Sequence, residues 1–169
     1  MTNYDKPYKF NIVLNSVDIS ELTVGNNNNK LSYEFNWTNI PRGAYKMSFS
    51  YRGLNNADFV ANDSPQIFLS LGSVPSVFQA SGETGSVISY YIGSLRTETH
   101  AGGQVYFYAN LNDNPDVYFE SMPTNGLIQI SIFKSDFITP FATAAASEIA
   151  DYVMVLAFEQ VGKVVGYSI

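Results

Sequence analysis

Hydrophobic and polar residues alternate with a period of two through much of the chain. Aromatic and aliphatic residues occupy every second position of Tyr8–Leu14, Leu31–Trp37 and Tyr45–Tyr51, with mostly polar residues between them. This alternation is typical of strands with one buried and one solvent-facing side. We therefore predict three amphipathic β-strands. The second and third are expected to form a hairpin through Thr38–Gly43, whose proline and glycine favour a turn.

Further strands are predicted where β-branched and aromatic residues are concentrated. These runs are Gln66–Leu71, Val87–Leu95, Gln104–Ala109, Leu127–Phe133 and Tyr152–Glu159, with a shorter extended piece at Val117–Glu120. The first two are apolar on both faces. Segments rich in Asn, Asp, Gly and Pro predict loops between the strands, and Thr97–Gly103 is predicted as a polar loop. The alanines of Phe141–Ala150 permit a short helix, and Gln160–Ile169 is interpreted as an extended arm or an added edge strand.

Eight main strands in a chain of 169 residues indicate a single all-β domain. The irregular spacing of the strands argues against a repeat propeller. Long connections favour a single jelly roll, an eight-stranded antiparallel β-sandwich of Greek-key type. An immunoglobulin-like sandwich is the alternative, although it usually needs only about 100 residues. We expect a jelly-roll domain at residues 8–160, an N-terminal arm at 1–7 and a C-terminal tail at 161–169.

Charge and cysteine content exclude several classes of function. The net charge is −6, and the nine Lys and Arg residues are scattered instead of forming the basic patch of a nucleic-acid-binding protein. Without cysteine there are no disulfides, thiol nucleophiles or zinc–thiolate sites. The missing cysteine suits a reducing compartment without proving one. No apolar run reaches about 18 residues, so no transmembrane segment is expected, and the first seven residues do not resemble a secretory signal.

Candidate catalytic residues are few. His100 is the only histidine and would have to serve any Ser–His–acid triad, with Glu98 as the orienting carboxylate. No Gly-x-Ser-x-Gly motif accompanies it, so an exposed loop histidine is the simpler interpretation. One imidazole also excludes multi-histidine metal sites. Glu34 and Glu120 are candidates for a glycosidase carboxylate pair, against the interpretation that both are ordinary solvated residues.

Three further motifs have simpler structural interpretations. Asp113–Asp116 could offer oxygen ligands to calcium, but it lacks the ligand series of an EF-hand and is explained by turn chemistry. Asn36 and Asn62 match the glycosylation pattern, which arises often by chance in a chain rich in Asn and Ser. Gly102–Gly103 lacks the features of a phosphate-binding loop. We therefore predict no catalytic, cofactor-binding or metal-binding residues.

Aromatic content is high, with twelve Tyr and twelve Phe. These side chains could simply fill the core of a sandwich. Alternatively, the strands Val87–Leu95 and Gln104–Ala109 could bury one face inside the domain and the other against another subunit. Tyr and Phe are enriched at interfaces because they contribute large, stiff contact areas.

Several short motifs occur in an order that is similar to that of one protein family. They are Tyr8–Leu14, Leu31–Trp37, Pro41–Tyr51, Ile92–Arg96, Asn114–Phe119, Pro123–Gly126 and Tyr152–Phe158. In these segments the chain resembles minor capsid proteins of large icosahedral double-stranded DNA viruses, the phycodnavirus-like and other nucleocytoplasmic large DNA viruses. The resemblance covers residues 8–160. It implies a single jelly-roll structural protein of the virion shell, with no catalytic residues to carry over.

The expected function is therefore structural and not enzymatic. The protein would be made in the host cytoplasm and would reside in the capsid shell, stabilising the major capsid protein lattice or forming the vertex penton. Its partners would be the major capsid protein, other minor capsid proteins and further copies of itself, with no direct contact to nucleic acid. We expect Met1–Pro7 and Val161–Ile169 to bind such partners.

Two alternatives stay open. One is a carbohydrate-binding, lectin-like β-sandwich in which Trp37 or tyrosines stack on sugar rings, although Trp37 continues the dry face of its strand. The other is a jelly-roll glycosidase that uses Glu34 and Glu120.

Overall fold

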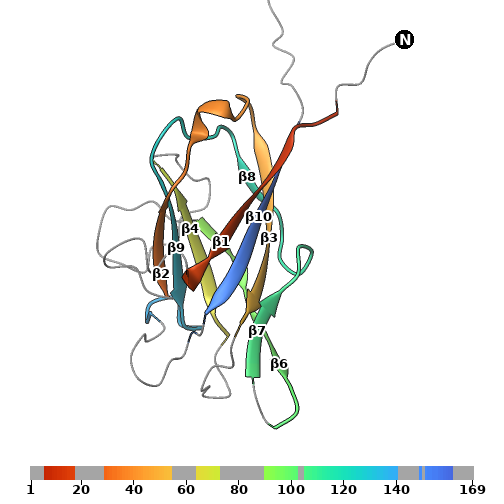
Figure 1. The fold of residues 1–169 in the computed structure, drawn as a ribbon, viewed down its shortest axis with the longest axis vertical. Coiled ribbons are helices and arrows are strands. Elements are labelled where there is room, and N and C mark those ends of the chain that lie inside the picture. Colours follow the sequence, from red (N-terminus) through yellow and green to blue (C-terminus); the bar gives the residue numbers. More distant parts are fainter. Residues whose placement is uncertain are drawn as a thin grey trace, which may run out of the picture.

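Two antiparallel β-sheets lie face to face in the computed structural model (Figure 1). The structure describes residues 6–17, 29–54, 64–72, 90–102, 105–140, 149 and 151–161. In chain order the elements are β1 (Lys9–Asn15), β2 (Lys30–Glu34), the short 3-10 helix η1 (Trp37–Asn39), β3 (Tyr45–Gly53), β4 (Gln66–Leu71), β5 (Tyr90–Ser94), β6 (Arg96–Thr99), β7 (Val105–Ala109), β8 (Val117–Phe119), β9 (Leu127–Phe133) and β10 (Tyr152–Gln160). The predicted all-β sandwich is confirmed.

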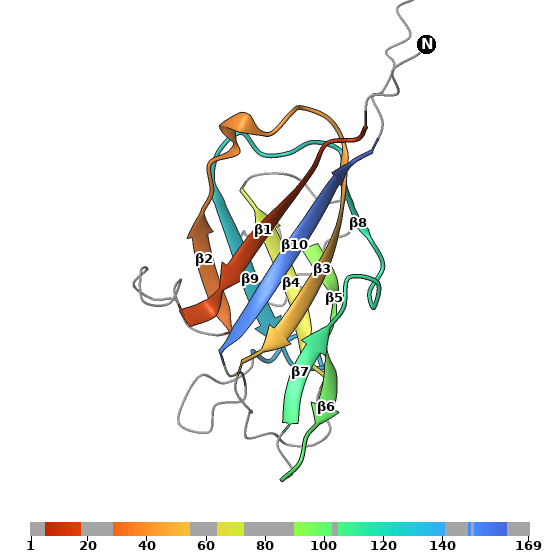
Figure 2. The ribbon, with the colours of Figure 1, turned by 45° about the vertical axis from the view of Figure 1, so that its right-hand side comes forward.

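The strands pair in a nested order. One sheet runs β1-β10-β3-β7-β6, with β8 also paired to β3, and the other runs β2-β9-β4-β5. Strands of the first half of the chain thus pair with strands of the second half in reverse: β1 with β10, β2 with β9, β3 with β8 and β4 with β5. Figure 2 shows β1, β10 and β3 crossing in front of β9 and β4. The two halves of the chain are therefore wound together around one core.

The core follows the alternation predicted for β3, and β10 shows the same pattern. In β3 the odd-numbered positions from Tyr45 to Tyr51 are buried, and in β10 the even-numbered positions from Tyr152 to Phe158 are buried. They pack with the inward side chains of the opposite sheet: Leu31, Ile67, Leu69, Leu71, Tyr90, Ile92, Ile128, Ile130 and Ile132. Because side chains alternate between the two sides of a strand, β3 and β10 each have one face in the core. Their other face points away from the core.

The strand β4 is buried on both sides, as its composition predicted. All six residues are buried. On the outer side the ring of Phe68 packs edge-on against Phe133, with ring centroids 5.2 Å apart, and against Tyr91 at 5.5 Å. The hydroxyl of Tyr91 donates a hydrogen bond to the side-chain oxygen of Gln66 at 2.7 Å. These aromatic side chains cover the outer side of β4.

The predicted hairpin between the second and third strands is wrong. β2 pairs with β9, and β3 pairs with β10, so the two segments belong to different sheets. The second strand also ends at Glu34 and not at Trp37. Residues 37–39 form η1, and the Asn36 side chain caps it by accepting a hydrogen bond from the Thr38 N–H at 3.1 Å. The connection carries the chain across the end of the sandwich.

The polar loop predicted at Thr97–Gly103 is partly wrong. Residues 96–99 form β6, which pairs with β7 although all four of its residues are exposed. Its backbone hydrogen bonds, and not a buried face, hold this strand in place. The β6–β7 hairpin projects past the end of β3 in Figures 1 and 2. The strands β6 and β8 were not among the eight main strands that were predicted, so the described strands number ten.

Several predicted segments lie outside the described residues. They are the helix at 141–150 apart from Ile149, residues 1–5 of the N-terminal arm, residues 162–169 of the tail, and the segment 73–89, which includes the start of the predicted strand Val87–Leu95. The described part of that strand, β5, is buried at Tyr90 and Ile92 and exposed at Tyr91.

A side-chain clamp joins the two sheets at β5. The amide of Asn114 accepts a hydrogen bond from the Ser94 N–H at 2.9 Å and donates one to the Ser94 carbonyl at 3.1 Å. The Asn114 side chain thus pairs with the N–H and the carbonyl of Ser94 as the backbone of a neighbouring strand would. Asn114 approaches so closely that a Cβ at Gly93 would lie 2.2 Å from its side-chain oxygen. Gly93 also has a φ of +143°, so glycine is required here for two reasons.

Candidate functional site

His100 lies just after β6, against the neighbouring strand. Its Nε2 is 3.4 Å from a carboxylate oxygen of Glu98, and its ring packs edge-on against Tyr106 with centroids 4.8 Å apart. Both the His100 and the Glu98 side chains are about half exposed. Within the described residues no serine or threonine hydroxyl contacts the imidazole. The structure therefore joins His100 to the predicted carboxylate, and within the described residues no hydroxyl nucleophile is hydrogen-bonded to the imidazole.

A pocket of about 290 Å³ opens beside this histidine. We call it the β3–β7 pocket. It is lined by Arg52, Gly53, Leu54, Glu98, His100, Tyr106, Phe107 and Tyr108. Arg52 faces Tyr108 across β3 and β7, and Tyr108 in turn faces Arg96 across β7 and β6. Sequence reasoning found Glu98 and His100 but missed Arg52 and both tyrosines, because their neighbourhood depends on the pairing of β7 with β3 and with β6.

The two carboxylates of the proposed glycosidase pair belong to different sheets. Glu34 ends β2 in the four-stranded sheet, whereas Glu120 follows β8 at the edge of the six-stranded sheet. A second hollow, of about 300 Å³, is lined by Glu34, Trp37 and six other residues, and Glu120 is not among them. The described geometry thus gives no support to a mechanism that uses these two carboxylates.

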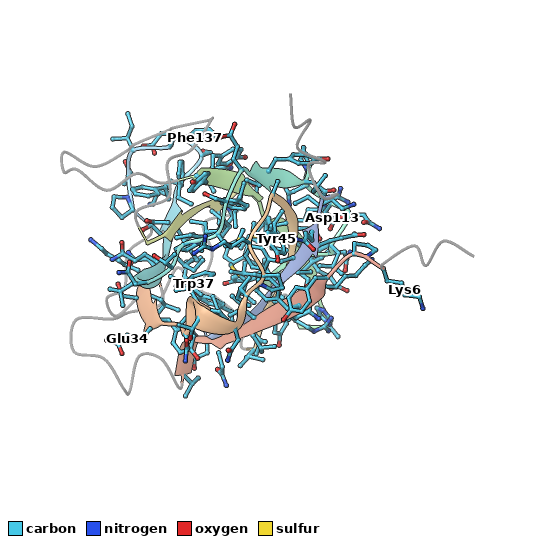
Figure 3. The ribbon with its side chains drawn as sticks, turned by 90° about the horizontal axis from the view of Figure 1, so that it is seen from above. Lys6, Glu34, Trp37, Tyr45, Asp113 and Phe137 are labelled. Atoms are coloured by element: carbon cyan, nitrogen blue, oxygen red, sulfur yellow. The ribbon has the colours of Figure 1, made fainter. Side chains whose placement is uncertain are left out.

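Trp37 is unsuited to stacking on a sugar. Only 3% of its surface is exposed, and its indole N–H donates a hydrogen bond to the Gly126 carbonyl at 3.0 Å. Phe35 packs edge-on against it with centroids 4.6 Å apart. In Figure 3 Trp37 lies between the sheets while Glu34 sits at the periphery. Its burial follows the prediction that it continues a dry face, although it belongs to η1 and not to a strand.

The oxygens of the proposed calcium loop are engaged by the protein. The Asp113 carboxylate accepts a hydrogen bond from the Asn110 N–H at 2.8 Å and lies 3.5 Å from Arg96. Asp116 lies 3.7 Å from Lys46. Asn114 clamps Ser94, as described above. No group of three or more His, Asp or Glu side chains that could hold a metal occurs in the described ranges. The loop is thus explained by its protein contacts.

The glycosylation candidate Asn36 is exposed at the start of η1. Its side-chain oxygen accepts hydrogen bonds from both the N–H and the hydroxyl of Thr38. This local structure accounts for the Asn-x-Thr pattern as a helix cap. Asn62 lies outside the described residues.

The outer side of the six-stranded sheet has an uncharged centre. Two rows of paired residues cross β1, β10 and β3: Val13, Val155 and Ser50 form one row, and Asn11, Ala157 and Ser48 form the other. We call these six residues the neutral face. Val13 is 61% exposed, although it is a β-branched aliphatic residue.

Charged groups border the neutral face. On one side Glu159 lies 3.1 Å from Lys9 and 3.4 Å from Lys46. Hydrogen bonding from Lys9, followed by that from Lys46, lowers the pKa of Glu159, and hydrogen bonding to Glu159 raises the pKa of Lys46. On the other side the next row ends in Arg52. The outer side of the six-stranded sheet thus has a centre without charged side chains and a charged border.

No family model matches the sequence, and curated proteins give no match either. In the described part of the chain, no helix is long and apolar enough to cross a membrane. A function must therefore be argued from the surface and the pockets.

Proposed function

We propose that this chain is a structural minor capsid protein of a large icosahedral double-stranded DNA virus. In this role it would pack against the major capsid protein lattice or form a vertex penton within the capsid shell. Its partners would be the major capsid protein, other minor capsid proteins and further copies of itself. The observation that carries the proposal is the neutral face with its charged border.

The strand order supports the finer assignment of the sandwich as a jelly roll. A jelly roll has eight main strands in two sheets and is built from Greek keys, in which strands far apart in sequence lie side by side. The nested pairing of β1 with β10, β2 with β9, β3 with β8 and β4 with β5 has this character. Such a fold also serves lectins and enzymes, so the proposal depends on the surface and not on the fold alone.

The neutral face is suited to permanent contact with a flat partner. Its six side chains stand on three paired strands, so they are held in fixed positions and lose little freedom on binding. Neither of its two rows contains a charge, and a partner therefore leaves no ion unpaired when it covers them. The bordering charges of Lys9, Lys46 and Glu159 would then set the orientation of the partner.

The first and last described residues lie close together at one end of the six-stranded sheet. The Gln160 N–H donates to the Tyr8 carbonyl at 2.8 Å, and the Val161 N–H donates to the Ala44 carbonyl at 2.8 Å. Lys6 and Pro7 therefore lie at the same end of the six-stranded sheet as Val161. The proximity of these two described ends is consistent with the proposal that Met1–Pro7 and Val161–Ile169 bind the same neighbouring subunit.

Purified particles from the source of this sequence provide the direct test. Lysine cross-linking and mass spectrometry should detect the chain in gradient-purified particles, with cross-links from Lys9 and Lys46 to the major capsid protein. These lysines border the neutral face. Lys134, which follows β9 in the other sheet, serves as the internal reference. Absence of the chain from the particles, or cross-links to capsid protein from Lys134 alone, would contradict the proposal.

A charge placed on the neutral face should prevent incorporation into the shell. Val13→Glu puts a carboxylate at an exposed position, so it is expected to leave the fold intact but to bury an unpaired ion in the interface. We expect at least about a tenfold loss of shell-bound protein, since a penalty of about 1.4 kcal/mol already gives this factor. Quantitative mass spectrometry of particles would measure it. Thr124→Glu, an equal charge on an exposed loop, is the control and should incorporate normally.

A further inference from the structure

We propose that the β3–β7 pocket binds a sugar acid, a monosaccharide unit that carries one carboxylate group. This inference goes beyond the shell role. It uses the pocket beside the β6–β7 hairpin and none of the residues of the neutral face.

The cationic group of the pocket is Arg52. Within the described residues its guanidinium forms no ion pair or hydrogen bond. By contrast, Arg96 on the same outer side pairs with Asp113, and Lys9 and Lys46 both pair with Glu159. A guanidinium presents parallel N–H groups that match a carboxylate in a bidentate arrangement. Among the described residues, nothing therefore competes for Arg52 with a carboxylate that enters the pocket.

Tyrosines supply flat contact surfaces beside this cation. Tyr106 and Tyr108 are two residues apart on β7, so their side chains emerge on the same side of the sheet. Both line the pocket and both are partly exposed. The ring of His100, edge-on to Tyr106, extends this surface. An aromatic ring can pack against the apolar C–H face of a sugar while its hydroxyl contacts water or polar groups.

Glu98 selects for hydroxyl groups and against dense negative charge. Its carboxylate contacts His100 through one oxygen and keeps further lone pairs that can accept hydrogen bonds from ligand hydroxyls. With Arg52 and Glu98 the formal charges of the pocket cancel, and the whole chain carries a net charge of −6. A multiply charged phosphate or sulfate would be repelled. A ligand with one carboxylate and several hydroxyls satisfies both residues.

The volume limits the size of the ligand. About 290 Å³ lies at the lower end of the range for small-molecule sites. A single sugar unit fills such a space, whereas a longer glycan would extend over the exposed β6 strand. The pocket thus recognises one acidic residue, either free or at the end of a chain.

Binding can be tested with glucuronate and N-acetylneuraminate as probes. Saturation-transfer NMR and isothermal titration calorimetry on the full chain should detect at least one of them with a Kd below about 10 mM. The methyl ester of the bound sugar acid, which lacks the negative charge, should bind at least about tenfold more weakly, since each tenfold change needs only about 1.4 kcal/mol. Inorganic phosphate should not compete at equal concentration.

Matched arginine variants locate the site. Arg52→Gln should weaken binding at least about tenfold, because the charged contact to the carboxylate is lost. Arg42→Gln removes the same charge from the connection between η1 and β3 and should leave the affinity unchanged. Circular dichroism checks that both variants are folded. No binding of either sugar acid, equal binding of acid and ester, displacement by phosphate, or an equal loss in both variants would overturn the proposal. None of these outcomes bears on shell incorporation.

Discussion

Gly93→Ala is expected to lower the free energy of unfolding by about 3 kcal/mol, combining backbone strain with lost hydrogen bonds. The φ of +143° at this position is one that side chains disfavour. The new Cβ would also lie 2.2 Å from the Asn114 oxygen and 2.3 Å from its amide carbon. Asn114 would have to move away, and its two hydrogen bonds to Ser94 would be broken.

Chemical denaturation followed by circular dichroism and by the fluorescence of Trp37 would measure this loss. Gly102→Ala is the matched control, because Gly102 also has a positive φ of +87° but a Cβ added there would meet no atom within 4 Å. It should cost about 1 kcal/mol of strain alone. In Gly93→Ala/Asn114→Ala the two costs should be less than additive, since they share one contact. Equal losses in the two glycine variants, or full additivity in the double variant, would contradict the clamp.

Alkaline pH is expected to unfold the protein, beginning above pH 10, through its buried tyrosines. The rings of Tyr51 and Tyr152 stack in the core with centroids 4.6 Å apart. Burial raises the pKa of both well above the ordinary value of 10.0. It also raises the pKa of Tyr90 to about 12. The folded state therefore keeps these hydroxyls protonated, while the unfolded chain releases their protons as soon as the pH passes 10.

The sign of the effect follows from this difference in bound protons. The stability contributed by neutral Tyr51 and Tyr152 is complete below pH 10 and is lost as the pH rises from there towards their folded pKa values. Each tyrosine then lowers the free energy of unfolding by about 1.4 kcal/mol per pH unit, so the two together remove about 3 kcal/mol per unit. We expect the tyrosinate absorbance of these buried rings to appear together with the loss of circular dichroism in one steep transition.

Tyr152→Phe isolates the contribution of one hydroxyl. Among the described residues this buried hydroxyl has no hydrogen-bond partner. Its removal should therefore leave the stability at pH 7 unchanged or raise it by about 1 kcal/mol, and it should shift the alkaline transition upward. Tyr118→Phe, at a 60% exposed position, is the control and should shift nothing. Unfolding of the Tyr152→Phe variant at the same pH as the parent would disprove this role of burial.

Sequence periodicity predicted which faces are dry, but not which strands are partners. The alternation in β3 was enough to place Tyr45, Met47 and Tyr51 on the core side, because a period of two fixes the side of the sheet. The same alternation is present in β2 and β3, and their closeness in sequence suggested a hairpin. In the structure β3 instead pairs with β10, a strand about one hundred residues away, and a local pattern holds no information on such a pairing.

The pocket could be predicted only in part for the same reason. Glu98 and His100 are two residues apart, so their association was visible in the sequence. Arg52 joins them only because β3 pairs with β7, and Tyr108 only because β7 lies between β3 and β6. The strand β6 itself escaped prediction, since its four residues bury no side chain and so lack any hydrophobic signal.

The place of β10 between β1 and β3 determines when the protein can finish folding. Among the described strands β10 is the last to leave the ribosome, yet it forms the seam of the six-stranded sheet. Until it arrives, β1 and β3 each present an unpaired backbone edge to other chains. Long-range pairing of this kind is slow to form. We therefore expect nascent and truncated chains that end before Tyr152 to aggregate or to require chaperones. A chain that contains β10 can instead pair it with both β1 and β3.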